Sequence, residues 1–184
     1  MGNFPANICT PEFLTKEAEK IAENKNVTLN IYDQKYLKKE GLNALLSVAK
    51  GSNLPPFLIH LEYGKKYNNP IVLIGKGVCF DSGGISLKPA AGMDEMKFDM
   101  CGAASVLGVF LAVTLLQLPV HLHVLVPAVE NMPSGTATHP GDVVKSLSGQ
   151  TIEIINTDAE GRLILCDALT FAERFKPAVV IDVA

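Results

Sequence analysis

The chain of 184 residues carries 16 Lys and Arg residues against 19 Asp and Glu, a formal net charge of -3, and 48% of its residues are hydrophobic. This length and apolar content suit one domain with a single core. Because no basic block occurs, the composition excludes the electrostatic surface that binds nucleic acid or an anionic membrane, and we expect a small molecule or another protein as partner. The 4 cysteines form no Cys-x-x-Cys pair and follow no signal peptide, so we expect reduced thiols in a cytoplasmic protein.

The first half of the chain alternates helix and strand signals. Thr10 followed by Pro11 is typical of a helix start, with threonine as the N-cap and proline in the first turn. Gly41 marks the end of a second helix. The predicted elements are a helix from 10 to about 24, a strand over 27–32, helices over 34–40 and 42–49, and strands over 57–62 and 71–74.

The second half opens with a Gly-rich segment over 75–92 and then continues the alternation. There follow a buried helix over 102–117, a strand over 120–127, a loop over 131–141, a hairpin turning at 148–149, a helix over 163–175 and a strand over 178–183. Near-continuous apolar strands between helices are typical of sheets covered on both faces. We expect an α/β layered fold whose mostly parallel or mixed sheet is flanked by helices.

The stretch from Met100 to Val129 contains no Asp, Glu, Lys or Arg and is long enough for a membrane helix of about 20 residues. Pro119 interrupts the stretch, and His121 and His123 follow it. A buried helix followed by a buried strand therefore fits better than a membrane span, and we expect no membrane partner.

Charged residues gather in two loops that follow predicted strands, the position where α/β sheets usually bind ligands. The first loop, after Ile74, contains lysines and acids, and the second reads Asn-Thr-Asp-Ala-Glu-Gly-Arg over 156–162. If the second loop is extended, Asp158, Glu160 and Arg162 point to one side, because side chains alternate along an extended chain. Solvated loop charges are the ordinary alternative.

Both loops belong to longer segments, GKGVCFDSGGISLKP and NTDAEGRLILCDAL, which resemble the two signature regions of the leucyl aminopeptidase family, also called cytosol aminopeptidases. The flanking stretches PANICTP, MDEMKFDMCGAA and ENMPSGTATHPGD extend the resemblance over essentially the whole chain. The resemblance implies that residues 1–184 are the N-terminal portion of a catalytic domain. Because the sequence stops inside an apolar strand, we expect that domain to be incomplete at the C-terminus.

In this family one lysine and four carboxylates hold two divalent cations, so the resemblance implies a site formed by Lys76, Asp81, Asp99, Asp158 and Glu160. Lys88 and Arg162 match the two catalytic side chains that are not ligands. Met96 matches a position that lines the pocket for the first substrate side chain, with a core methionine as the alternative. The implied enzyme removes N-terminal, Leu-like residues from peptides, uses Mn or Zn with Mg as a further candidate, holds bicarbonate at Arg162 and assembles as a homo-hexamer.

Elementary electrostatics is consistent with this ligand set. Two divalent ions about 3.5 to 4 Å apart repel by roughly 19 kcal/mol at an effective dielectric constant of about 20. Four carboxylates cancel their formal charge, whereas without metal the same carboxylates would repel one another and take up protons. Lys76 could bind metal only after losing its proton, at a cost of roughly 4 to 5 kcal/mol at pH 7 that a neighbouring cation offsets.

The stretch CFDSGG over 79–84 raises a different possibility, because an acid, a serine and two glycines also frame the nucleophile of trypsin-like serine proteases. Such a protein would be all-β and would place a catalytic histidine upstream in its own motif. Only His60, inside an apolar strand, precedes Ser82 here. We therefore expect Asp81 to bind metal and Ser82 not to act as a nucleophile.

Three further alternatives stay open at this point. His121 and His123 share one face of a predicted strand and could bind metal, although hydrogen-bonded core histidines are the expectation. The Gly-Lys-Gly over 75–77 could cradle phosphate, but no GxxxxGK[ST] motif is present. A homologue that binds or assembles without cleaving peptides is a different class of function, against which the intact ligand set argues. We also expect the 184-residue chain alone to be inactive or weakly active.

Overall fold

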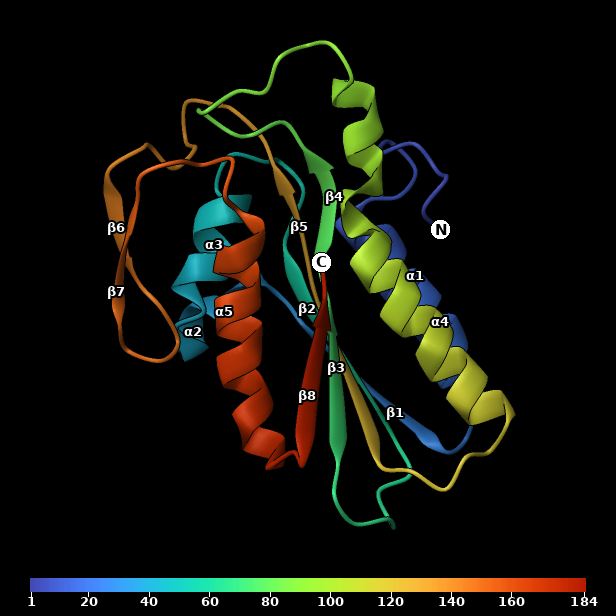
Figure 1. Ribbon diagram of the computed structural model, residues 1–184. Helices are drawn as coiled ribbons and strands as arrows, with labels where there is room; N and C mark the ends of the chain where they lie inside the picture. Colours follow the sequence, from blue (N-terminus) through green and yellow to red (C-terminus); the bar gives the residue numbers. More distant parts are fainter.

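The computed structural model describes every residue from Met1 to Ala184, and the chain folds into a mixed β-sheet with helices on both faces and a separate two-stranded hairpin (Figure 1). The helices are α1 (Pro11–Ala22), α2 (Gln34–Glu40), α3 (Asn43–Ala49), α4 (Cys101–Leu115) and α5 (Gly161–Ala172), with 3-10 helices η1 (Met93–Met100) and η2 (Glu173–Phe175). The strands are β1 (Val27–Tyr32), β2 (Phe57–Tyr63), β3 (Ile71–Gly75), β4 (Gly77–Asp81), β5 (Leu122–Asn131), β6 (Asp142–Lys145), β7 (Thr151–Ile154) and β8 (Val179–Val183). The predicted α/β layered fold is confirmed.

Strand β5 lies at the centre of the main sheet, whose order is β1-β2-β5-β3-β8. It pairs antiparallel with β2 and parallel with β3. β4 also runs parallel to β5, directly beyond β3, because Ile74 pairs with Leu125 and Gly77 pairs with Ala128. The sheet is therefore mixed, and Lys76 lies at the junction where one edge of β5 changes partner from β3 to β4.

Both faces of the sheet are covered, which explains why its central strands are apolar throughout. α1 and α4 pack on one face, and α3 and α5 pack on the other (Figure 1). Every residue from Leu122 to Val129 of β5 is buried. Its side chains alternate between the two cores, with Val124 beside α1 and α4 and with Leu125 beside α3 and α5.

The structure differs from the sequence expectation in three segments. No strand or helix is predicted for the stretches that form β4 and η1. The segment over 156–162 is not extended but turns into α5, because the Ala159 N–H donates to the Asn156 carbonyl at 3.2 Å and Glu160 has helical backbone angles. Arg162 therefore belongs to the first turn of a helix.

A buried pair of imidazoles joins β2 to β5. His60 Nε2 lies 2.9 Å from His123 Nδ1, and both side chains are buried. Burial lowers the pKa of both imidazoles to about 4, so both rings are neutral at pH 7. His121 is hydrogen-bonded as well, with its Nε2 3.0 Å from Glu62 Oε1. The expectation that the histidines of this strand are hydrogen-bonded is confirmed.

Helix α4 gave rise to the membrane alternative. With η1 it forms a run of 23 residues, Met93–Leu115, that is apolar and long enough to cross a membrane. The core helix of a soluble protein can have the same length and apolar composition. Val106 and Phe110 are buried against the sheet, whereas Val109 and Leu115 are 48% and 70% exposed. One face of α4 is therefore part of the core, as the buried-helix interpretation expects.

Two glycines of α4 form a matched pair that tests this packing. A Cβ added at Gly102 would lie 2.1 Å from the Val183 carbonyl oxygen, whereas one added at Gly108 would meet nothing within 4 Å. We predict that Gly102→Ala lowers the free energy of unfolding by about 1–3 kcal/mol, the usual range for overpacking. Gly108→Ala should raise it by roughly 0.5–1 kcal/mol, because alanine favours helix. Urea unfolding measures both values, and equal stabilities would contradict the close approach of α4 to β8.

Candidate active site

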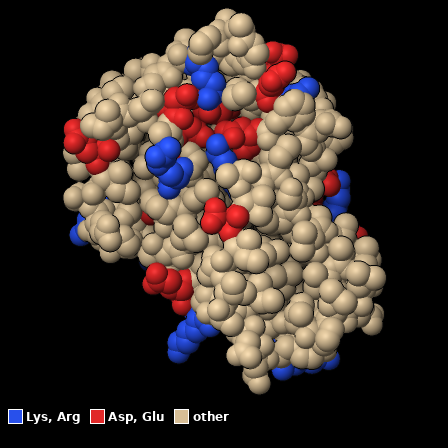
Figure 2. Space-filling model, in the orientation of Figure 1, with Lys and Arg blue, Asp and Glu red and all other residues tan.

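The predicted site residues come together where the parallel strands end. Asp81 is the last residue of β4 and pairs with Asn131, the last residue of β5. Lys76 joins β3 to β4, while Asp158 and Glu160 come from the turn before α5. The edge of the sheet at which α/β folds usually bind ligands therefore carries these charges. Figure 2 shows acidic and basic side chains gathered in a hollow of the surface.

Asp81 is fixed by hydrogen bonds on its inner side. Its Oδ1 accepts from the Gly83 N–H at 2.9 Å and from Asn131 Nδ2 at 2.8 Å. Gly83 has a φ of 89°, and a Cβ there would lie 2.4 Å from the Ser86 carbonyl oxygen, so the turn requires glycine. The second oxygen of Asp81 faces the cluster and lies 2.9 Å from Lys88 Nζ.

The Ser82 side chain makes hydrogen bonds that stabilise the turn after β4. Its hydroxyl is buried and donates to the Asn131 carbonyl at 2.7 Å. The hydrogen bonds of Ser82 connect it to backbone groups, and none joins it to a histidine. The arrangement of a base beside an activated serine is therefore absent from this turn.

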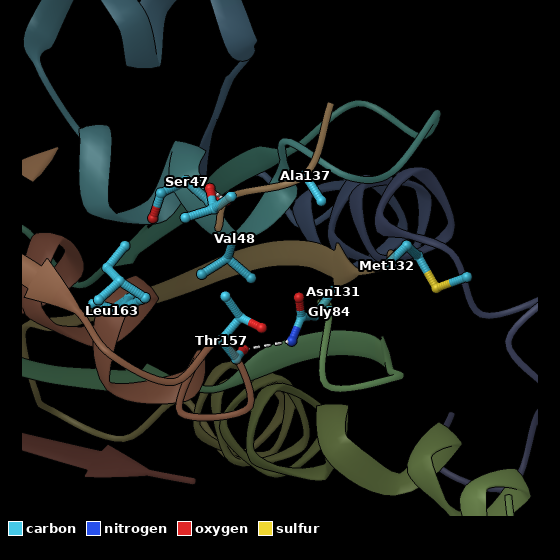
Figure 3. Close-up of a pocket in the computed structure, with 10 residues that line it drawn as sticks. Ser47, Val48, Gly84, Asn131, Met132, Ala137, Thr157 and Leu163 are labelled. Atoms are coloured by element: carbon cyan, nitrogen blue, oxygen red, sulfur yellow. Dashed lines mark hydrogen bonds between the residues drawn. The ribbon is translucent and has the colours of Figure 1, made fainter. Parts of the chain in front are cut away.

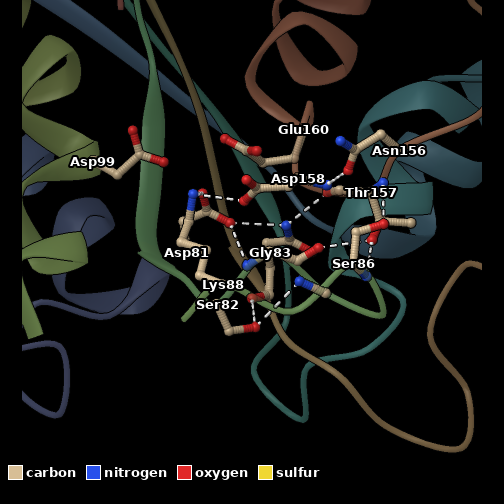
Figure 4. Close-up of polar contacts among 12 residues, drawn as sticks. Asp81, Ser82, Gly83, Ser86, Lys88, Asp99, Asn156, Thr157, Asp158 and Glu160 are labelled. Atoms are coloured by element: carbon tan, nitrogen blue, oxygen red, sulfur yellow. Dashed lines mark hydrogen bonds and ion pairs between the residues drawn. The ribbon is translucent and has the colours of Figure 1, made fainter. Parts of the chain in front are cut away.

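Four carboxylates and two ammonium groups form the centre of the site, and Figure 4 shows the carboxylates together with Lys88. Lys76 Nζ lies 2.6 Å from Asp99 Oδ1 and 2.8 Å from Glu160 Oε1. Lys88 Nζ pairs with Asp81 and with Asp158. Oxygen atoms of Asp81, Asp158 and Glu160 all lie within 4.8 Å of one another. Four negative and two positive charges leave an excess of two negative charges in this small volume.

Two carboxylate oxygens of this centre lack ordinary partners. Asp99 Oδ2 and Asp158 Oδ1 are buried and accept no hydrogen bond, and Asp158 Oδ1 has only the ion pair with Lys88. Burial raises the pKa of the Asp99 carboxyl to about 6, despite its hydrogen bond with Lys76. Buried oxygens without partners, next to excess negative charge, fit a group of oxygen ligands that binds divalent cations.

Lys76 is protonated in this arrangement. Burial opposes its charge, but hydrogen bonds to Asp99 and Glu160 raise its pKa above the ordinary value. An ammonium has no lone pair, so Lys76 could become a ligand only by transferring its proton away. Two glycines leave room for this residue: a Cβ at Gly161 would lie 2.6 Å from Cε of the Lys76 side chain, and one at Gly102 would lie 2.9 Å from the Lys76 backbone nitrogen.

Arg162 and Met96 lie at the edge of this centre. Arg162 is exposed at the start of α5 and lines a hollow of about 330 Å³ together with Lys76, Asp158 and Glu160. Met96 is half-buried in η1, one turn before Asp99. The structure therefore brings Arg162 to the cluster and shows no contact that connects Met96 with it.

Asn131 and Thr157 are supporting residues that no pattern in the sequence indicates separately. Asn131 Nδ2 donates to the Thr157 carbonyl at 2.9 Å (Figure 3) and also donates to Asp81. The Thr157 hydroxyl donates to the Gly83 carbonyl at 2.7 Å and accepts from the Ser86 N–H at 2.8 Å. The cavity behind them holds about 10 Å³, room for roughly one water, so its walls position the site and bind no substrate.

Comparison with known proteins agrees with this geometry. Residues 1–184 match the catalytic domain of the cytosol aminopeptidase family. A probable cytosol aminopeptidase of Dechloromonas aromatica (strain RCB) is 61% identical over 100% of the chain, which covers 37% of that protein. The crystal structure of a cytosol aminopeptidase from Coxiella burnetii superposes with a TM-score of 0.93 at 42% identity, over 97% of this chain and 39% of that one. A leucine aminopeptidase of Caenorhabditis elegans gives a TM-score of 0.94 at 38% identity, over 98% of this chain and 37% of that one.

The chain thus spans little more than a third of the length of the relatives that it matches. Within that span the match is continuous and includes both charged loops of the site. Sequence and structure lead to the same assignment, and the chain belongs to the cytosol aminopeptidase family, a family of peptidases.

Proposed function

We propose that residues 1–184 form the N-terminal, metal-binding portion of a catalytic domain whose enzyme removes N-terminal, Leu-like residues from peptides. The observation that carries this proposal is the convergence of four carboxylates and Lys76, with a buried oxygen of Asp99 that has neither a hydrogen bond nor an ion pair. A cluster of this kind is costly as structure alone and is useful as a site for cations.

The ions would be held by Lys76, Asp81, Asp99, Asp158 and Glu160. Two divalent cations in such a site supply polarisation of the scissile carbonyl and a water of lowered pKa. Oxygen ligands with one amine suit Mn, Zn or Mg, so the metal supply would select among them. Asn131 and Gly83 hold the inner oxygen of Asp81 in place, which leaves its outer oxygen, paired here with Lys88, facing the position of a cation.

Lys88 would act on the substrate and not on the metal. Its ammonium contacts Asp81 and Asp158, whose negative charge raises its pKa above the ordinary value, although burial opposes the charge. A lysine that keeps its proton can donate a hydrogen bond to the carbonyl oxygen of the peptide as negative charge develops there. Lys88 follows the Gly-rich turn after β4, from which it reaches the cluster.

The remaining roles are proposed for the assembled enzyme. Arg162 and the N-terminus of α5 both offer positive charge at the hollow beside the cluster and would hold a bicarbonate, which would supply a proton acceptor there. Met96 would contact the first side chain of the peptide. We propose a cytoplasmic location, in keeping with the name of the family. We also propose the homo-hexamer that the sequence resemblance implies.

Parts of the surface support a further proposal, that the 184-residue chain by itself is inactive or weakly active. Val179 and Ile181 of β8 are 44% and 49% exposed, although β8 lies directly next to β3. Gly102 and the Lys76 amide both contact Val183 at the end of this strand, so a poorly supported β8 would loosen the ligand Lys76.

Asp81 and Ser82 are neighbours that separate the metal mechanism from a serine mechanism. In a chain extended to the length of the relatives, we predict that Asp81→Ala abolishes metal binding and peptidase activity. Ser82→Ala should retain most activity and lose only about 1 kcal/mol of stability with its hydrogen bond. Metal analysis and hydrolysis of a leucyl peptide measure both effects. Full activity of Asp81→Ala, or loss of activity in Ser82→Ala with metal retained, would refute the assignment.

Lys88 allows binding to be separated from chemistry. We predict that Lys88→Ala in the extended chain retains both metal ions and lowers kcat by about 10²- to 10³-fold, the usual loss for a group that stabilises an oxyanion. Lys35→Ala, at an exposed lysine of α2, is the matched control and should leave kcat unchanged. A Lys88→Ala enzyme with near-normal kcat would show that Lys88 serves only the fold or the ion pairs.

A further inference from the structure

A second group of metal-ligating side chains lies at the opposite end of the central strand. Asn131 ends β5 at the active site, whereas Leu122 begins it. At about 3.3 Å per residue these ends are about 30 Å apart, and Figure 1 shows them at opposite ends of the sheet. His121 and His123 stand at the beginning of β5, and Glu62 of β2 pairs with His123 across the two strands. All three side chains meet on the sheet face that α5 covers.

The ligand atoms of the three residues point at one another. His121 Nε2 lies 3.0 Å from Glu62 Oε1, and His123 Nε2 lies 4.0 Å from the same oxygen. The ligand atoms of all three side chains lie within 4.8 Å of one another. Two imidazole nitrogens and a carboxylate oxygen therefore converge on a common point, although the residues come from two strands.

We propose that Glu62, His121 and His123 form a binding site for one divalent transition-metal ion of the Zn²⁺ class, separate from the carboxylate cluster. Two histidines and one carboxylate are a ligand set that holds zinc in three-ligand sites and leaves a position for water. Imidazole ligands favour Zn over Mg or Mn, whereas the oxygen-rich cluster at the other end of β5 accepts those harder ions as well. The two ends of one strand thus carry sites of different metal preference.

Neighbouring groups hold the ring of His123 in place. His60 Nε2 lies 2.9 Å from His123 Nδ1, and Asn30 Nδ2 lies 3.3 Å from His60 Nδ1. Phe175 stacks on His123 with ring centroids 4.2 Å apart. Metal-binding histidines usually have such a partner on the second ring nitrogen, which fixes the nitrogen that faces the ion. His123 is buried, while Glu62 and His121 are 15% and 13% exposed and leave an approach for an ion.

Metal binding would reverse the direction of the hydrogen bonds that join Asn30, His60 and His123. When the Asn30 amide donates to His60 Nδ1, the proton of His60 is on Nε2. This N–H then donates a hydrogen bond to His123 Nδ1, so the proton of neutral His123 is on Nε2. A metal at His123 Nε2 requires the proton on Nδ1, which then donates to His60 Nε2. His60 Nδ1 would donate in turn to the Asn30 carbonyl oxygen after a rotation of its amide. Each residue keeps the same number of protons, so the switch releases none.

The probe is the Zn²⁺ ion, which is added to the chain in the presence of excess Mn²⁺ that occupies the carboxylate cluster. We expect the 184-residue chain to take up one further Zn²⁺ per chain by calorimetry and metal analysis. His121→Gln and Glu62→Gln should each weaken that uptake by at least about 100-fold, the upper end of the loss seen for outer partners of metal ligands. His139→Gln is the matched control, because the His139 side chain is 67% exposed and lies outside both clusters. It should bind Zn²⁺ like the parent chain.

Two further measurements keep the outcome clear. Thermal unfolding without Zn²⁺ shows whether each variant is folded. With Mn²⁺ in excess, the parent and the His139→Gln chain should gain more Tm on addition of Zn²⁺ than His121→Gln and Glu62→Gln do. The parent bound to Co²⁺ should show visible absorption bands that His121→Gln lacks. Equal Zn²⁺ affinity in the parent, His121→Gln and Glu62→Gln chains would overturn the proposal, as would an absence of Zn²⁺ uptake once the carboxylate cluster is filled.

Discussion

The site depends on one interaction, the attraction that two ammonium groups exert on four carboxylates at the end of the sheet. Without Lys76 and Lys88 the carboxylates of Asp81, Asp99, Asp158 and Glu160 would repel one another at distances of a few ångströms. The two lysines stand beside the same oxygens that divalent cations would contact. The chain can therefore keep these carboxylates close together, because lysine side chains supply part of the positive charge.

The fold serves this interaction through the backbone on either side of Lys76. The Lys76 N–H donates to Val183 at 2.8 Å, and its carbonyl accepts from Ala103 at 2.9 Å, so β8 and the start of α4 fix the residue from both sides. Gly102 and Gly161 let α4 and α5 approach closely enough for these contacts. Asn131, at the end of β5, then connects Asp81 with the turn that carries Asp158. Strands β5 and β8 and helices α4 and α5 thus each constrain part of the charged cluster.

The sequence predicted the parts of the fold that depend on local patterns. The N-cap at Thr10 and the glycine that ends α2 are local signals, and both elements are present. β4 was missed because five residues in a Gly-rich stretch are too few for a periodic signal, and the pairing of β4 with β5 supplies the missing stability. The turn at 156–158 was missed because side-chain spacing does not report backbone angles.

Similar reasons apply to the side chains of the two candidate sites. The charged residues of the cluster were identified because they occur together in short segments that resemble a family signature. Asn131 was not identified, because an amide that supports a ligand has no pattern of its own. Glu62 was not connected with His121, because the strand pairing that brings them together spans 59 residues. Patterns over a few neighbouring residues do not reveal which distant strands pair with one another.

The central claim is that Lys76 exchanges its proton for a metal ion, and proton release on metal binding tests it most directly. Mn²⁺ titrations at pH 8 in buffers of different ionisation enthalpy measure the protons released per chain. At this pH the carboxylates are already ionised, and a metal-bound water would lose its proton equally in the parent and in Lys76→Met. The account therefore predicts weaker metal binding by Lys76→Met and release of about one proton more by the parent, from Lys76. Equal proton release by the two chains on binding of the same number of ions would contradict the claim.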